Sequence, residues 1–150
     1  MYVIDASAYA PLIVSYGKAL TQSLQKVKAM ILDLTVYETC NAYWKLCIKL
    51  HSISKEDAKL ACVTAKNIAQ KIHTCALADL DIDRAIEIAL KESITFYDAA
   101  YIALAQRLNA PLVSEDQDIV ATAPKYDLKV IKLYDFTQKL RQFLSSSTGT

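Results

Sequence analysis

The stretch TFYDAAYIALAQRLNAPLVSEDQDI, residues 95–119, contains the pattern that decides the fold. Small and apolar residues dominate residues 95–108 and predict a buried helix, which opens with the Thr-x-x-Asp spacing of a helix cap. Residues 110–114 (APLVS) follow as a short β-strand, and acidic residues come directly after them. A helix, a strand and an acidic turn in this order are typical of one unit of an α/β domain.

The same alternation extends over the rest of the chain. Apolar runs of strand length predict strands at residues 1–5, 29–34, 75–80, 110–114 and 128–133. Helical periodicity predicts helices at residues 17–28, 35–50, 54–71, 83–91 and 95–108. Strands that alternate with helices indicate an α/β fold, in which helices cover both faces of a central parallel sheet of about five strands.

Length and composition limit the domain organisation. The chain has 150 residues, of which 53% are hydrophobic and 22% charged, so it is long enough for one domain with a full core. We predict a single domain over residues 1–144. Residues 145–150, SSSTGT, contain no core-forming side chain and are expected to form a flexible C-terminal tail.

Composition also excludes several classes of function. Two glycines, Gly17 and Gly149, are too few for a glycine-rich phosphate loop, which excludes Rossmann-type dinucleotide binding and P-loop NTPase chemistry. The formal net charge is only +1, so the chain lacks the strongly basic character typical of nucleic-acid-binding proteins.

Targeting signals and cysteines bear on the compartment. No segment has the pattern of a signal peptide or a membrane span. The four cysteines form no Cys-x-x-Cys pair, which favours buried thiols in a reducing compartment. The sequence therefore predicts a cytoplasmic protein.

Four acids stand where predicted strands end or predicted helices begin. They are Asp5 after the first strand, Glu38 in the helix after the second, Asp98 in the helix 95–108 and Asp116 after the fourth strand. Ligands of α/β proteins bind where the carboxyl ends of the strands meet. Carboxylates gathered there would repel one another by roughly 3 kcal/mol for each ionised pair at about 6 Å. Mg²⁺ or Mn²⁺, which prefer carboxylate oxygens, would make such a cluster favourable.

Each of these acids also has a purely structural interpretation. Asp5 can cap the helix that follows it, with Ser7 as a competing cap. Glu38 and Asp98 each lie three residues after a threonine, as the acid of a capping box does. Helical periodicity does not establish whether the carboxylates converge, so both interpretations stay open at this point.

Residues next to the acids leave two further alternatives. Asp118 follows Asp116 closely and is a second candidate ligand. Tyr37, Tyr97 and Tyr101 could stack on nucleic-acid bases, as aromatic residues do in single-strand binders. Aromatic residues in the first turns of helices more often belong to the core, and we predict the core position for these three tyrosines.

Three segments resemble the successive motifs of PIN-domain proteins, most closely the VapC-type toxins of toxin–antitoxin pairs. They are MYVIDASAYAPL (1–12), LTVYETCNAYWK (34–45) and TFYDAAYIALAQRLNAPLVSEDQDI (95–119), and the resemblance extends to about residue 133. The resemblance implies a three-layer α/β/α fold. By motif position it also implies metal ligands at Asp5, Glu38, Asp98 and Asp116, with Ser114 orienting a carboxylate or water and Ser7 in a small polar position.

The resemblance further implies a metal-dependent endoribonuclease. One or two Mg²⁺ or Mn²⁺ ions would activate a water that attacks phosphorus in line and leaves 5′-phosphate and 3′-hydroxyl ends. A cognate antitoxin protein and a homodimer or higher homo-oligomer are implied as well. The alternative is a non-catalytic PIN-like module that binds RNA or serves assembly. The presence of all four acids favours the enzyme.

Overall fold

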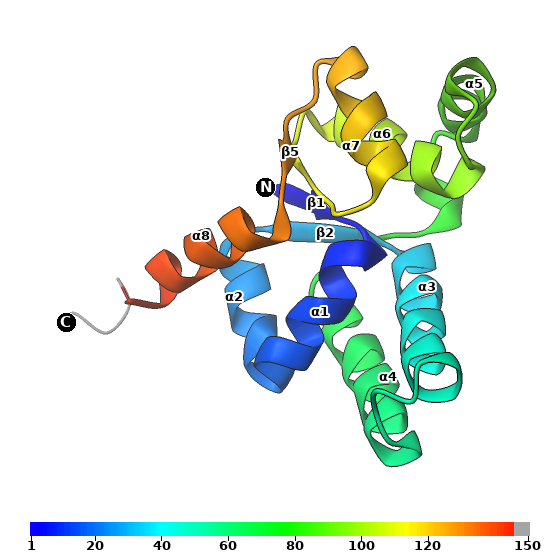
Figure 1. Ribbon diagram of the computed structural model, residues 1–150. Helices are drawn as coiled ribbons and strands as arrows, with labels where there is room; N and C mark the ends of the chain where they lie inside the picture. Colours follow the sequence, from blue (N-terminus) through cyan, green and yellow to red (C-terminus); the bar gives the residue numbers. More distant parts are fainter. Residues whose placement is uncertain (146–150) are drawn as a thin grey trace.

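A five-stranded parallel sheet forms the centre of the protein (Figure 1). The computed structural model describes residues 1–145. The strands are β1 (Tyr2–Ile4), β2 (Ala29–Leu32), β3 (His73–Cys75), β4 (Leu112–Val113) and β5 (Val130–Ile131). Their order is β3-β2-β1-β4-β5, and every neighbouring pair is parallel. The first strand is therefore central, and the strand order reverses around it.

Helices connect the strands and cover the sheet. The α-helices of the described residues are α1 (Ala6–Tyr16), α2 (Leu20–Lys26), α3 (Asp33–Trp44), α4 (Lys55–Ala69), α5 (Ile82–Glu92), α6 (Phe96–Leu108), α7 (Gln117–Thr122) and α8 (Leu133–Ser145). Short 3-10 turns lie at Gly17–Ala19, Leu77–Asp79 and Ala123–Tyr126, and a π-helical turn at Lys45–Lys49 extends α3. None of the helices within residues 1–145 combines the length and apolar character needed to cross a membrane.

Both faces of the sheet are buried because consecutive strand residues point to opposite sides. Val3 belongs to a core shared with α5, α6 and α7, whereas its neighbour Ile4 belongs to a core shared with α1, α2, α3, α4 and α8. Figure 1 shows these two groups of helices on opposite sides of the strands. The predicted three-layer α/β/α fold, in which a parallel sheet lies between two layers of helices, is confirmed.

The buried helix predicted at residues 95–108 is α6. Thr95 caps its start by accepting a hydrogen bond from the Asp98 backbone N–H at 3.1 Å. Asn109 ends it in the left-handed conformation, with φ of 48°. Every residue from Ala99 to Ala105 is buried, so α6 presents apolar side chains in all directions and lies within the second core.

Several predicted boundaries differ from the structure. β3 occupies residues 73–75 instead of 75–80, and a 3-10 turn follows it. The helix predicted at 17–28 is a 3-10 turn followed by α2, because Gly17 adopts a positive φ of 52° that ends α1. The helix predicted at 35–50 begins two residues earlier, at Asp33, and changes to the π-helical turn at Lys45.

The sequence patterns do not predict α1, α7 and α8. Pro11 lies inside α1, where it removes a backbone donor and weakens the helical signal. α7 has six residues, too few for periodicity to be detected. The predicted tail, residues 145–150, lies outside the described residues apart from Ser145, the last residue of α8. All four cysteines are free thiols that are buried or half-buried.

We expect Phe136→Ala to lower the free energy of unfolding by about 3–5 kcal/mol, because it leaves a cavity in the first core. Phe136 is fully buried on α8, and its ring meets the Tyr2 ring edge-on with the centroids 5.3 Å apart. Tyr134, on the same helix, is 73% exposed, so Tyr134→Ala should cost less than about 1 kcal/mol. Urea unfolding measures both variants. Equal effects would contradict a single domain that includes α8 and ends near residue 144.

Candidate metal centre

The four acids predicted as ligands lie at the carboxyl edge of the sheet. Asp5 directly follows β1, and Asp116 follows β4, which is the neighbour of β1 in the sheet. Glu38 lies in the second turn of α3, which starts where β2 ends. Asp98 lies in the first turn of α6, whose start is at this edge because α6 runs back toward the beginning of β4. The topology therefore gathers acids that are distant in the sequence.

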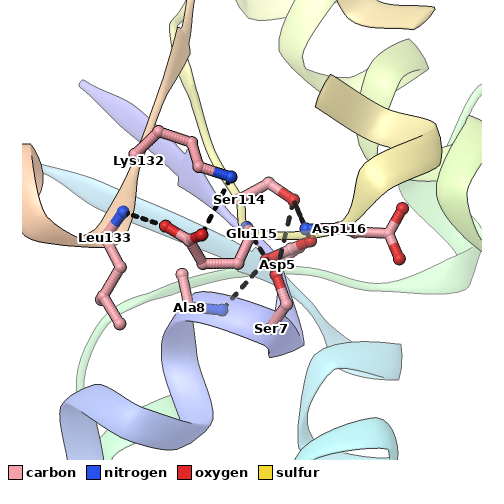
Figure 2. Close-up of polar contacts among 8 residues, drawn as sticks. All are labelled: Asp5, Ser7, Ala8, Ser114, Glu115, Asp116, Lys132 and Leu133. Carbon is pink, nitrogen blue, oxygen red and sulfur yellow. Dashed lines mark hydrogen bonds and ion pairs between the residues drawn. The ribbon is translucent and has the colours of Figure 1, made fainter. Parts of the chain in front are cut away.

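Asp5 is held between two serine hydroxyls (Figure 2). Only 3% of Asp5 is exposed. Its Oδ1 accepts hydrogen bonds from Ser7 Oγ at 2.7 Å and from the Ala8 backbone N–H at 3.2 Å, and its Oδ2 accepts one from Ser114 Oγ at 2.5 Å. The two serine oxygens lie 3.4 Å apart, but each already donates its hydrogen to Asp5.

Each of these hydroxyls in turn accepts a hydrogen bond from the turn after β4. Ser7 Oγ accepts from the Glu115 backbone N–H at 2.8 Å, and Ser114 Oγ accepts from the Asp116 backbone N–H at 3.0 Å. Each hydroxyl thus accepts from a backbone amide and donates to Asp5, and such a chain of hydrogen bonds strengthens each bond in it. Ser114 thus orients a carboxylate, the role that the motif resemblance implies for it.

Burial raises the pKa of Asp5 to about 6, although the hydrogen bonds from Ser114, Ser7 and Ala8 favour the ionised form. Repulsion from the Asp116 carboxylate adds to the rise. The hydrogen bonds therefore offset only part of the cost of burying this charge, and a cation nearby would favour the ionised carboxylate.

Glu38 is held by Tyr101, a residue that we predicted to be part of the core. Tyr101, on α6, donates a hydrogen bond from its hydroxyl to Glu38 Oε1 at 2.8 Å. Burial raises the pKa of Glu38, and repulsion from Asp5, Asp98 and Asp116 raises it further. The capping-box interpretation of Glu38 is wrong: Thr35, three residues before it, lies in the first turn of α3 and accepts a hydrogen bond from the Leu32 N–H instead.

Asp98 and Asp116 combine a capping contact with a place in the acidic cluster. Asp98 Oδ2 accepts a hydrogen bond from the Thr95 hydroxyl at 2.8 Å, and Thr95 accepts one from the Asp98 N–H. Asp116 caps α7 with Oδ1, which accepts from the backbone N–H groups of Asp118 and Ile119. Burial raises the pKa of Asp98, and repulsion from Asp116 and Asp118 adds to it. Among the described residues, no hydrogen bond occupies Asp98 Oδ1 or Asp116 Oδ2.

Asp118, the alternative ligand to Asp116, also belongs to the cluster. Within the described part of the chain, Asp98, Asp116 and Asp118 form the group of three whose carboxylate oxygens lie within 4.8 Å of one another. Asp5 and Glu38 are outside this group, but Asp116 lies near enough to raise the pKa of both after burial has done so. The structure thus places Asp98, Asp116 and Asp118 close together, with Asp118 exposed, and Asp5 and Glu38 near enough to interact with Asp116 electrostatically.

The charge of the cluster is not neutralised by basic side chains. Within residues 1–143, no ion pair joins any of these five acids to Lys or Arg. Glu115, between Ser114 and Asp116, turns away and pairs with Lys132 at 2.9 Å while accepting from the Leu133 N–H, as Figure 2 shows. A set of oxygen donors without a basic partner fits a hard divalent ion such as Mg²⁺ or Mn²⁺.

Two of the three tyrosines predicted to lie in the core are on the surface. Tyr37 is 77% exposed and Tyr97 is 56% exposed, whereas Tyr101 is buried as predicted. Tyr37 and Tyr97 directly precede Glu38 and Asp98, and both line an apolar pocket of about 350 Å³. The core prediction fails for them because helical periodicity does not show which face of a helix start is covered.

The amino-acid sequence matches the PIN domain family over residues 2–135. It is 31% identical over 120 residues to "Exonuclease VapC9" of Pyrobaculum aerophilum, and the aligned region covers 80% of this chain and 84% of that protein. It is 32% identical over 134 residues to "Ribonuclease VapC3" of the same organism, with 81% and 94% covered. The crystal structure of PAE2754 from Pyrobaculum aerophilum matches the fold with a TM-score of 0.70 and 29% identity, over 94% of this chain and 96% of that one. The chain belongs to the PIN-domain family.

We expect the metal-free protein to become more stable as the pH falls from 7 to 5. At pH 5 the folded protein binds a proton on Asp5, whose pKa is raised to about 6, while the unfolded chain with the ordinary value of 3.8 does not. Protonation therefore favours the folded state, by about 1 kcal/mol from Asp5 alone. Glu38 and Asp98, whose pKa values burial also raises, act in the same direction.

Urea unfolding in EDTA at pH 7 and pH 5 measures this effect. Asp5→Asn cannot take up the proton, so the variant should gain less stability on acidification than the wild type. The same gain in both proteins would contradict the burial of an ionisable carboxylate at this position.

Proposed function

We propose that this protein is a Mg²⁺- or Mn²⁺-dependent endoribonuclease and the toxin of a toxin–antitoxin pair. The observation that carries the proposal is the cluster of carboxylates at the carboxyl edge of the sheet, which no basic side chain in residues 1–143 neutralises. Membership of the PIN-domain family and the names of the two relatives support a nuclease. The ligands are Asp5, Glu38, Asp98 and Asp116, with Asp118 as a further or alternative ligand.

A divalent ion at this cluster supplies Lewis acidity, through which it activates water and offsets charge on the phosphate. The protein's own residues hold the ligands in place. Asp5 is fixed by Ser7 and Ser114, and Glu38 by Tyr101. Ser114 is fully buried and its hydrogen is committed to Asp5, so it serves as an orienting group and not as a nucleophile. The cut leaves 5′-phosphate and 3′-hydroxyl ends.

Exposed aromatic rings beside the acids support a single-stranded substrate. Tyr37 and Tyr97 line the same apolar pocket, each one residue from a proposed ligand. Unpaired bases stack on such rings with little dependence on sequence. The rings therefore offer a place for a base when the neighbouring phosphate lies at the carboxylates.

The alternative is a PIN-like module that binds RNA without cutting it. Loss of one of the motif acids would favour that function, and all four are present. The pKa values of Asp5, Glu38 and Asp98 are all raised, first by burial and then by neighbouring carboxylates, which is typical of functional sites.

A toxin of this kind implies two protein partners and a cytoplasmic location. An antitoxin protein would restrain the nuclease in the cytoplasm, where its RNA targets are. A second copy of the chain would form a homodimer or a higher homo-oligomer. An apolar stripe along α5 supports such self-association, because Ile82, Ile86 and Leu90 are 46%, 39% and 75% exposed. A monomeric mass in light scattering of the purified protein would contradict the dimer.

We expect Asp98→Asn to abolish Mg²⁺- or Mn²⁺-dependent cleavage of RNA while leaving the fold intact. The amide oxygen can still accept from the Thr95 hydroxyl, so the capping contact survives, and one repelling charge is removed. A circular RNA is the substrate, because only an endonuclease can open it. End mapping of the products tests for 5′-phosphate and 3′-hydroxyl groups, and EDTA should stop the reaction.

The matched control is Asp83→Asn, which removes an exposed acid from the first turn of α5 and should leave cleavage unchanged. Full activity of Asp98→Asn would remove Asp98 from the ligand set. A wild type that binds RNA but leaves the circle closed would favour the non-catalytic module, and one that degrades only linear RNA would make the enzyme an exonuclease. Growth arrest on expression of the wild type, and its absence with Asp98→Asn, tests the toxin role.

A further inference from the structure

We propose that Tyr101 is a positioning residue for Glu38, with Thr35 behind it, and that the two set the orientation of one metal ligand. The inference rests on the proposed metal-dependent function. Tyr101 is 1% exposed and Thr35 is fully buried, so neither side chain is free to reorient toward solvent. The Tyr101 hydroxyl lies 2.8 Å from Glu38 Oε1 and 2.8 Å from Thr35 Oγ1.

The hydrogen bonds in this group can run in one direction only. An ionised Glu38 accepts hydrogen bonds and cannot donate, so Tyr101 must give its single hydroxyl hydrogen to Glu38. Thr35 Oγ1 must then donate to Tyr101, and it accepts from the Leu32 backbone N–H at 3.1 Å. The chain of donors begins at an amide, which cannot reverse, and ends at the carboxylate.

The geometry sets one oxygen of Glu38 apart from the other. Oε1 is occupied by Tyr101, and among the described residues no hydrogen bond occupies Oε2. The carboxylate therefore cannot rotate freely, and Oε2 is the oxygen left for a cation. Hydrogen-bonding partners of this kind orient metal ligands and influence affinity for the ion.

The same contact joins two of the proposed ligands. Tyr101 lies three residues after Asp98 on α6, so it shares a helix face with that acid. By holding Glu38 on α3, it fixes the start of α3 relative to the helix that carries Asp98. Leu32, at the origin of the chain, is the last residue of β2, so Glu38 is tied to the sheet edge as well. Asp5 is held in a comparable way, by serine hydroxyls that accept from backbone amides.

Mn²⁺ binding by the purified full-length protein tests the inference without relying on activity. We expect Tyr101→Phe, which removes only the hydroxyl, to weaken Mn²⁺ binding about tenfold in calorimetry. In RNA cleavage it should lower kcat, while KM changes less than about twofold because Tyr101 does not reach the substrate. Tyr43→Phe is the control, since Tyr43 is a buried tyrosine on α3 whose hydroxyl donates to the Ala10 carbonyl, away from the acids.

A double-mutant cycle separates positioning from general packing. In a Glu38→Ala background, which removes the acceptor of the Tyr101 hydroxyl, Tyr101→Phe should have no further effect on Mn²⁺ binding, because its contact acts through the Glu38 carboxylate. If Tyr101→Phe does not fold, the pair Thr35→Ser and Thr35→Val gives the answer. The serine keeps the hydroxyl and should bind Mn²⁺ as the wild type does, and the valine should bind it more weakly.

Two outcomes would overturn the inference. In the first, the wild type binds Mn²⁺ and cleaves RNA, but Tyr101→Phe and Tyr43→Phe have the same Mn²⁺ affinity. This result would leave the proposed function intact. The other is a loss of affinity that persists in the Glu38→Ala background or is equal for both Thr35 variants. A wild type that binds no Mn²⁺ contradicts this inference and the proposed function together.

Discussion

A carboxylate buried at the end of the central strand is the constraint on which the rest of the site depends. Asp5 is 3% exposed, and burial raises its pKa to about 6. An anion in that position requires donors, and the hydroxyls of Ser7 and Ser114 provide them. Ser114 directly follows β4, and both hydroxyls accept hydrogen bonds from the backbone of Glu115 and Asp116 in the turn after it. These contacts tie the start of α1 to that turn. Asp116 is brought to Asp5 by the same contacts that keep Asp5 ionisable.

Helix starts hold the acids in two different ways. Asp5 and Asp116 cap α1 and α7, and Asp98 lies in the first turn of α6, where the helix dipole favours a negative charge. A capping contact and the proposed ligand role are therefore compatible in one residue. Glu38 lies in the second turn of α3, beyond the reach of a capping contact, and depends on Tyr101 from another helix. The acids remain close although they repel, an arrangement that a divalent cation would stabilise.

The fold was predictable because its signals are local. Apolar runs place β1, β2, β4 and β5, and the small apolar residues of 95–108 predict the buried helix α6. Pro11 conceals α1, and the apolar strand signal at 75–80 misplaces β3. Side-chain burial was less predictable: we predicted a core position for three tyrosines, but Tyr37 and Tyr97 are exposed and only Tyr101 is buried. Burial depends on which elements cover a helix start, and no single helix encodes that.

The sequence by itself determined the alternation of strands and helices, the four motif acids, and the capping threonine and aspartates, because each depends on residues within a few positions of one another. Only the tertiary structure decided that Asp118 joins Asp98 and Asp116, and that Tyr101 donates to Glu38. Those contacts join separate helices and turns. Their distances depend on how the helices pack on the two faces of the sheet, and the periodicity of one segment carries no information about its neighbour.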